Sequence, residues 1–158
     1  MEVRIRTAIA ADLDAVLTLL KELDESHVLL EPSLLQPFSD PPRPSEWLLA
    51  RFSDPSEACF VAETKKRIVG FVWSKSQPPP AIPAFIQQPL QLIGDLVVEA
   101  SQRRRGIGLS LMNRALEWGR ARGLTQVQLT VFEKNREARA FYEKLGFRPL
   151  SVVLLKQL

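Results

Sequence analysis

A strand, a glycine-containing turn and a helix follow one another between residues 90 and 120, and this succession constrains the fold most strongly. Leu90 to Val98 is an apolar run of strand length, whereas Gly106 to Arg120 repeats its apolar residues at spacings of three and four. The turn that joins them reads EASQRRRGIG. A strand that runs into a helix in this way is typical of an α/β fold, in which the helix packs back onto the sheet.

The rest of the chain alternates strands and helices without an internal repeat. Period-two alternation and helical spacing predict strands at Glu2–Thr7, Ala58–Glu63, Ile68–Ser74 and Val127–Val131, and helices that begin at Asp12, Ser45 and Asn135. Two proline-rich segments, residues 31–44 and 78–89, are predicted loops because proline cannot continue a helix interior. They are either rigid surface connections or gates of a substrate site. Length and order together predict one domain over residues 1–158.

Composition argues against several classes of protein. With 21 Lys and Arg against 18 Asp and Glu, the net charge is 21 − 18 = +3, a small excess and weak evidence for nucleic-acid binding. One cysteine, Cys59, excludes an internal disulfide, and one histidine, His27, argues against a zinc site, so we expect no metal. No stretch approaches the roughly 20 apolar residues of a membrane helix. The first residues are charged, so we expect a cytoplasmic protein that binds no membrane.

The turn has the properties of an anion-binding site. The first backbone N–H groups of a helix have no partner within the helix, and the helix dipole makes that end positive. Glycines let the backbone approach a phosphate closely, and three consecutive arginines add charge. The Walker pattern is absent, and Leu111 stands where a dinucleotide-binding loop needs its third glycine. The alternative interpretations are a solvated basic turn and a contact to nucleic acid.

Three segments resemble the GCN5-related N-acetyltransferase family. Arg103-x-x-Gly106-x-Gly108 matches its acyl-CoA-binding motif, Arg/Gln-x-x-Gly-x-Gly/Ala. DLVVEASQ, which includes the start of the turn, looks like the family's fourth strand, and NREARAFYEKLGF is similar to its Asn-x-x-Ala-x-x-Phe-Tyr signature. The resemblance implies an α/β (α+β) fold with a mixed, mostly antiparallel sheet of six to seven strands, flanked by four helices and splayed between strands four and five. It also implies acetyl-CoA as cosubstrate and direct N-acetyl transfer to a primary amine of a small molecule or peptide.

The resemblance further implies roles for particular residues. Tyr142 corresponds to the tyrosine that protonates the departing CoA thiolate, and Asn135 to the asparagine that contacts the pantetheine arm. Pantetheine would pair with the backbone of the fourth strand at Leu96, Val97 and Val98, and the N–H of Val98 would face the thioester oxygen. The expected contacts to the pyrophosphate come from Arg103, Arg104, Arg105, Gly106, Ile107, Gly108 and Leu109. Without the resemblance, Tyr142 is a packed aromatic residue and Asn135 a helix cap.

The usual general base of the family is missing. Many members have a glutamate on the fourth strand at the position of Gly94, in IGDLVV. Removing a proton at pH 7 from an amine with a pKa near 10.4 costs roughly 4–5 kcal/mol, whereas an α-amine near 8 costs only about 1.4 kcal/mol. Either the acceptor has a low amine pKa, or another group acts through water, and the candidates are Asp95, His27, Glu25 and Glu31. A protein that binds acyl-CoA without catalysis is the other interpretation of Gly94.

The C-terminal segment RPLSVVLLKQL is shorter than the two-stranded hairpin that most of the family has here. We therefore predict one long terminal strand. Such a strand leaves an apolar sheet edge uncovered, and an uncovered edge tends to pair with another chain. A homodimer that packs these strands is the simplest arrangement.

Overall fold

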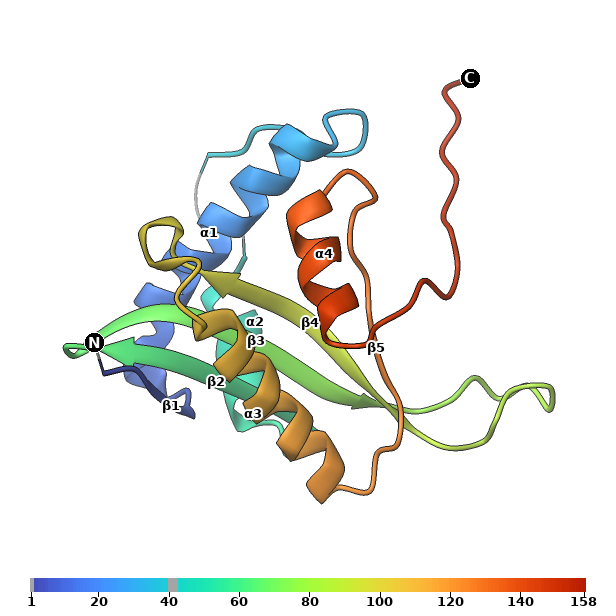
Figure 1. The fold of residues 1–158 in the computed structure, drawn as a ribbon, viewed down its shortest axis with the longest axis horizontal. Helices are drawn as coiled ribbons and strands as arrows, with labels where there is room; N and C mark the ends of the chain where they lie inside the picture. The colour runs from blue at the N-terminus through green and yellow to red at the C-terminus, as the bar shows by residue number, and fades with distance from the viewer. Residues whose placement is uncertain (1, 40–42) are drawn as a thin grey trace.

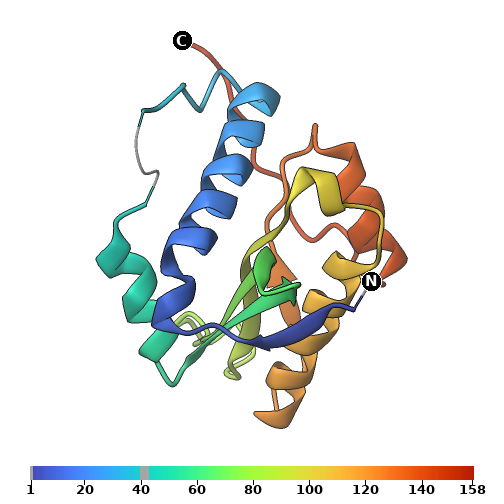
Figure 2. The ribbon, with the colours of Figure 1, turned by 90° about the vertical axis from the view of Figure 1, so that its left-hand side faces the viewer.

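A computed structural model of the chain describes residues 2–39 and 43–158. Its centre is a five-stranded sheet with helices on both faces (Figures 1 and 2). The strands, in their order across the sheet, are β1 (Arg4–Thr7), β2 (Glu57–Thr64), β3 (Arg67–Gln77), β4 (Leu90–Val98) and β5 (Val127–Leu129). The first four are antiparallel neighbours, whereas β4 and β5 are parallel. The predicted mixed, mostly antiparallel α/β fold is confirmed.

Four α-helices flank the sheet, as predicted. They are α1 (Leu13–Leu30), α2 (Ser45–Ser53), α3 (Ile107–Ala121) and α4 (Arg136–Lys144). Short 3-10 turns lie at Ala10–Asp12, before α1, and at Ala100–Gln102, between β4 and α3. None of the helices within residues 2–39 and 43–158 is long and apolar enough to cross a membrane.

The sheet separates two hydrophobic cores. On one face, α1 and α2 bury residues such as Val16, Leu20 and Leu48 against the sheet. On the other, α3 buries residues such as Leu111 and Met112. The middle parts of β2 (58–62) and β3 (68–73) are continuous apolar runs, since their side chains alternate between two covered faces.

The predicted C-terminal strand is wrong. Residues 148–158 pair with no strand and form an exposed tail. The described part of the chain therefore has five strands, where we predicted six to seven. The apolar run SVVLL favours a strand, but a strand forms only where a neighbour accepts its backbone hydrogen bonds. Of the first proline-rich loop, residues 40–42 lie outside the described residues.

Candidate active site

Strands β4 and β5 are neighbours at one end only. The parallel pairing joins Gln91, Leu92 and Ile93 of β4 to Val127–Leu129. The rest of β4, residues 94–98, lies beyond this pairing and is bordered by β3 alone. We call the side of residues 94–98 that faces away from β3 the open edge of β4. The predicted splay between the fourth and fifth strands is thus confirmed.

A β-bulge at Gly94 interrupts the ladder between β3 and β4. Trp73 lies opposite Asp95, whereas Ser74 lies opposite Ile93, so Gly94 is the extra residue. An extra residue reverses the alternation of side chains and backbone groups from that point on. Ile93 therefore faces the α3 side of the sheet, whereas Asp95 faces the α1 side.

The reversal decides which backbone groups face the open edge. Beyond the bulge, the Glu99 N–H donates to the Val69 carbonyl of β3 at 2.9 Å. Along an antiparallel strand, every second residue directs its N–H and C=O groups to the same neighbour. Val97 therefore also bonds to β3. Leu96 and Val98 direct their N–H and C=O groups away from β3, toward the open edge. Of the three residues expected to pair with pantetheine, Leu96 presents its N–H and C=O groups and Val98 its N–H, since the Val98 carbonyl accepts a hydrogen bond from Arg103. Val97 uses its backbone in the sheet and its side chain, 3% exposed, in the core.

The ring of Trp73 occupies the space where a side chain at position 94 would lie. A Cβ built on Gly94 would lie 1.9 Å from Trp73 Cε3 and 2.2 Å from Cζ3. The ring is held in place because its Nε1 donates to Glu57 at 2.6 Å and the Arg51 guanidinium lies 4.7 Å from its centroid. No glutamate fits at position 94 while Trp73 keeps this position. Position 94 therefore cannot supply the general base, and the candidates are the four side chains named from the sequence.

The turn before α3 brings a helix N-terminus to the end of the open edge. Gly106 has a φ of +78°, in the left-handed region, and its carbonyl accepts the first α-helical bond, from Ser110 N–H at 3.0 Å. The N–H groups before Ser110 point out of the helix end. A Cβ built on Gly108 would lie 3.8 Å from both Val98 and Phe141, so this helix end contacts β4 and α4. A site for a pyrophosphate at the turn can thus continue into a site for pantetheine along β4.

The three arginines of the turn have different surroundings. Arg103 turns back toward the sheet, where its Nε donates to the Val98 carbonyl at 3.0 Å and its Nη2 to Glu22 of α1 at 3.2 Å. Arg104, with a φ of +62°, is exposed and lies 3.3 Å from a carboxylate of α4. Arg105 is also exposed. Arg103 therefore fixes the turn to β4, and the side chains best placed for a phosphate are those of Arg104 and Arg105.

An ion-pair network covers the α1 side of the bulge. Arg43 donates to Asp95 at 2.6 and 3.1 Å, and to Asp24 of α1 at 3.0 and 3.4 Å. Burial acts to lower the pKa of Arg43, but the hydrogen bonds and charges of the two carboxylates together raise it. Because both oxygens of Asp95 are bound by a permanent cation, this carboxylate is poorly placed to accept a proton from a substrate.

His27, on α1, lies beside the same network. Its ring meets Phe132, which follows β5, edge to face with the centroids 5.2 Å apart. Burial lowers the pKa of His27 below its ordinary value. The carboxylates of Asp24 and Asp95 oppose this shift, and Arg43 adds to it. The imidazole is therefore neutral at pH 7 and able to accept a proton.

The two remaining candidates for the base are less suited. Glu25 is mostly exposed and lies 3.9 Å from Lys21, one helical turn away. Glu31 accepts a hydrogen bond from Ser33 and lies 3.4 Å from Lys134. The bond from Ser33, with the contribution of Lys134, lowers the pKa of Glu31 and makes it a weaker base. Among the candidates, His27 has the most suitable environment.

Tyr142 approaches from α4. Its half-buried ring packs edge to face on Phe141, at 5.3 Å between centroids, and on Phe147, at 5.7 Å. Burial raises the pKa of Tyr142 to about 12, and the negative charge of Asp95 adds to the shift. The hydroxyl therefore keeps its proton across the physiological range. The negative charge of Asp95, on β4, thus acts to raise the pKa of both His27 and Tyr142.

Asn135 stands at the N-cap of α4. Its Oδ1 accepts a hydrogen bond from the Ala138 N–H at 3.1 Å, so its capping role is confirmed. The contact of Asn135 with pantetheine stays a prediction. The cap fixes where α4 begins and so helps to set the position of Tyr142 two turns later.

Sequence analysis missed three residues that shape the site. Arg43 follows a run of prolines, Trp73 lies within an apolar strand, and Glu22 lies on an ordinary amphipathic helix. None of them belongs to a motif. Their roles depend on contacts between elements far apart in the chain, so no local signal could have indicated them.

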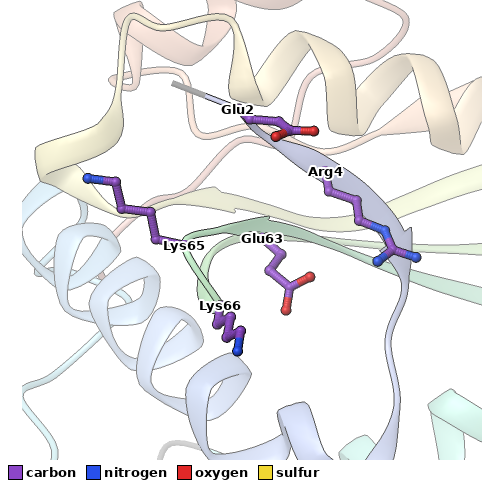
Figure 3. A pocket seen from close by; sticks show the side chains of 5 residues that line it. All are labelled: Glu2, Arg4, Glu63, Lys65 and Lys66. Carbon is purple, nitrogen blue, oxygen red and sulfur yellow. The ribbon is translucent and has the colours of Figure 1, made fainter.

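A charged hollow lies at the other edge of the sheet. Figure 3 shows that it is lined by Glu2, Arg4, Glu63, Lys65 and Lys66. These residues lie in β1 or just before it, in β2 and in the turn after β2, and β1 and β5 are opposite edges of the sheet. The lining mixes both signs of charge and contains no motif residue. We therefore place the candidate site at the open edge of β4.

The open edge of β4, next to a glycine turn that starts a helix, is the arrangement expected of the family that the sequence motifs resemble. The chain belongs to the acetyltransferase (GNAT) family, whose sequence profile matches residues 20–147. This agrees with the resemblance found in the motifs.

The relatives of the chain include proteins named as acetyltransferases. It is 34% identical over 127 residues to a mycothiol acetyltransferase of Thermomonospora curvata, which covers 76% of this chain and 40% of the relative. It is 33% identical over 90 residues to an L-2,4-diaminobutyric acid acetyltransferase of Shouchella clausii, which covers 57% of this chain and 47% of the relative. An uncharacterized N-acetyltransferase of Methanocaldococcus jannaschii is 34% identical over 108 residues, with coverages of 68% and 45%. The chain thus spans less than half the length of these relatives.

Solved structures share the fold. A mutant of a Bacillus halodurans protein superposes with a TM-score of 0.92 at 24% identity, covering 98% of this chain and 99% of that one. The aminoglycoside N-acetyltransferase AAC(6')-Iy, in complex with CoA, superposes with a TM-score of 0.73 at 18% identity, covering 99% and 95%. At these identities the likeness establishes the fold alone.

Proposed function

We propose that the protein is an acetyl-CoA-dependent N-acetyltransferase that transfers an acetyl group directly to a primary amine of a small molecule or peptide. The observation that carries the proposal is the open edge of β4, where Leu96 and Val98 present backbone groups directly beside the N-terminus of α3. The names of the mycothiol, diaminobutyrate and aminoglycoside acetyltransferases among its relatives favour a small-molecule acceptor.

The donor binds through groups that the turn and β4 provide. The pyrophosphate lies on the amides of Gly106 to Leu109, with Arg104 and Arg105 as charged partners. Pantetheine pairs with Leu96 and Val98, and the Val98 N–H points at the thioester oxygen. A hydrogen-bond donor fixed where negative charge develops lowers the activation free energy by roughly 3 kcal/mol in comparable sites.

The reaction needs one base and one acid. The neutral amine nitrogen attacks the thioester carbonyl carbon, the C–N bond forms and the C–S bond breaks. His27 accepts the proton that the amine loses, directly or through a water, and Tyr142 donates its proton to the departing thiolate. Although burial raises the pKa of Tyr142 to about 12, a thiolate that leaves into the same desolvated space is also more basic than in water. An acceptor with a low amine pKa would reduce the demand on His27.

Two measurements test the proposal. Acetyl-CoA at about 100 times its Kd should stabilise the fold by about 2.7 kcal/mol, seen as a higher melting temperature. A panel of amines, assayed for release of the CoA thiol, should then identify the acceptor class. Absence of any thermal shift with acetyl-CoA and CoA would refute donor binding. A shift without thiol release from any amine would favour a protein that binds acyl-CoA without catalysis.

A further inference from the structure

Arg43 connects three elements on the α1 side of the sheet. It lies just before α2, and its guanidinium binds Asp95 of β4 at 2.6 and 3.1 Å and Asp24 of α1 at 3.0 and 3.4 Å. All three side chains are largely covered, with exposed fractions of 20% for Arg43, 25% for Asp24 and 11% for Asp95. Arginine can bind two carboxylates at once because its guanidinium is a planar fork of donors, which lysine lacks.

His27 lies next to this network. Asp24 and His27 are three residues apart on α1, so their side chains are neighbours on one face of the helix. Burial lowers the pKa of His27; the charges of Asp24 and Asp95 act against this shift, and the charge of Arg43 acts with it. Removal of Arg43 would therefore leave two covered carboxylates near the imidazole without the cation that binds them both.

An aromatic ring and an ion pair border His27 from other directions. Phe132, on the connection between β5 and α4, meets the imidazole edge to face at 5.2 Å. Glu31 donates its N–H to the His27 carbonyl, and its carboxylate lies 3.4 Å from Lys134, so that this pair is neutral as a whole. The network of Arg43, by contrast, combines one cation with two carboxylates and has a net charge of −1.

We propose that Arg43 is a positioning residue of the acceptor side, which binds both carboxylates and so keeps His27 neutral. The inference rests on the proposed function, in which His27 accepts the proton of the amine. Without Arg43 the net charge of the network becomes −2, which favours the imidazolium form of His27. An imidazolium has no free nitrogen to accept a proton, so a smaller fraction of the protein would be active at pH 7.

The surroundings of Arg43 fix the position of its charge. Its guanidinium lies 5.1 Å from the ring of Trp47 on α2, and that ring meets Trp73 edge to face at 5.8 Å. Trp73 is the side chain that fills the space beside Gly94. A covered cation held between α1, α2 and the bulge acts on its neighbours with little screening, whereas an exposed one is screened by salt.

The pKa of His27 can be measured directly, because the chain contains one histidine. NMR titration of the imidazole signals should show a pKa raised by about one unit in Arg43→Gln and lowered by a similar amount in Asp95→Asn. The double variant Arg43→Gln/Asp95→Asn restores the net charge of −1, and its His27 pKa should return close to that of the unmodified protein. A pKa that stays raised in the double variant would overturn the proposal.

Two single variants serve as controls. Arg43→Lys keeps the charge but loses the fork, so the melting temperature should fall while the pKa of His27 stays close to its original value. Arg120→Gln removes the same charge from an exposed position on α3, on the other face of the sheet, and should leave that pKa unchanged. An unchanged pKa in Arg43→Gln, or an equal rise in Arg120→Gln, would overturn the proposal.

Kinetics separate this proposal from the proposed function. In Arg43→Gln the acidic limb of kcat/KM should move to higher pH by the same amount as the pKa of His27. The thermal shift with acetyl-CoA should stay the same, because the turn before α3 is unchanged. If the pKa rises and the acidic limb stays where it was, Arg43 does keep His27 neutral, but His27 is not the base of the proposed function.

Discussion

Helices α3 and α4 lie on the same side of the sheet but are packed very differently. α3 buries six residues, among them Leu111, Met112 and Ala115, whereas α4 buries none. Five of the nine residues of α4 are charged, so it has little apolar surface to bury. α3 brings the glycine turn that would hold the donor, and α4 brings Tyr142, which would act in the reaction. The helix that carries the proposed binding turn is therefore more firmly packed than the helix that carries Tyr142.

The largest effect on activity should come from a substitution on α4, the more loosely packed of the two helices. Tyr142→Phe removes the acid but keeps the ring and its aromatic contacts, so kcat should fall by roughly 10²–10⁴-fold. The Kd for acetyl-CoA, measured by thermal shift, should stay the same. An unchanged kcat would show that α4 contributes packing rather than chemistry.

Core truncations compare the packing of the two helices directly. Leu111→Ala removes a fully buried side chain of α3 and should lower the free energy of unfolding by about 2–5 kcal/mol. Leu145→Ala, at the partly covered end of α4, should cost about 1 kcal/mol, because less apolar area is lost. Denaturant unfolding measures both.

The pH profile tests the base. The folded-state pKa of His27 lies below its ordinary value of 6.5, so the imidazole is neutral at pH 7 and gains a proton only as the pH falls further. kcat/KM should therefore fall about tenfold per pH unit below that lowered pKa, and His27→Asn should abolish this acidic limb. Because the unfolded chain binds this proton first, the fold should also lose stability as the pH falls from 6.5 through the folded-state pKa. An acidic limb that persists in His27→Asn would refute the role.

The smallest changes in stability are expected for alanine substitutions at the two glycines of the turn, and the two changes should differ. Gly106→Ala places a side chain in the left-handed region and should cost about 1–2 kcal/mol, with weaker acetyl-CoA binding. Gly108→Ala places its Cβ at ordinary contact distance from Val98 and Phe141, so the fold should tolerate it. Thermal melting with and without acetyl-CoA measures both effects. A Gly108→Ala variant less stable than Gly106→Ala would show that the helix end is packed more tightly than its contacts indicate.

Local patterns predicted the parts of the fold that depend on local chemistry. The bounds of β4, the hairpin of β2 and β3, and the start of α3 at a glycine follow from periodicity and turn residues. The acid and base assignments were harder to predict. Asp95 and His27 were equal candidates in the sequence, and only Arg43, which binds both oxygens of Asp95, separates them.

By itself, the sequence determined the family and located the proposed donor site, because the turn before α3 uses contiguous residues whose glycines and charges are of the kind that bind an anion. Tertiary structure alone decided the rest. The packing of Trp73 over Gly94 excludes a glutamate there, and the bulge at Gly94 turns Leu96 and Val98 toward the open edge. Whether the apolar tail becomes a strand depends on an edge that accepts its hydrogen bonds, and no pattern within the tail can supply that edge.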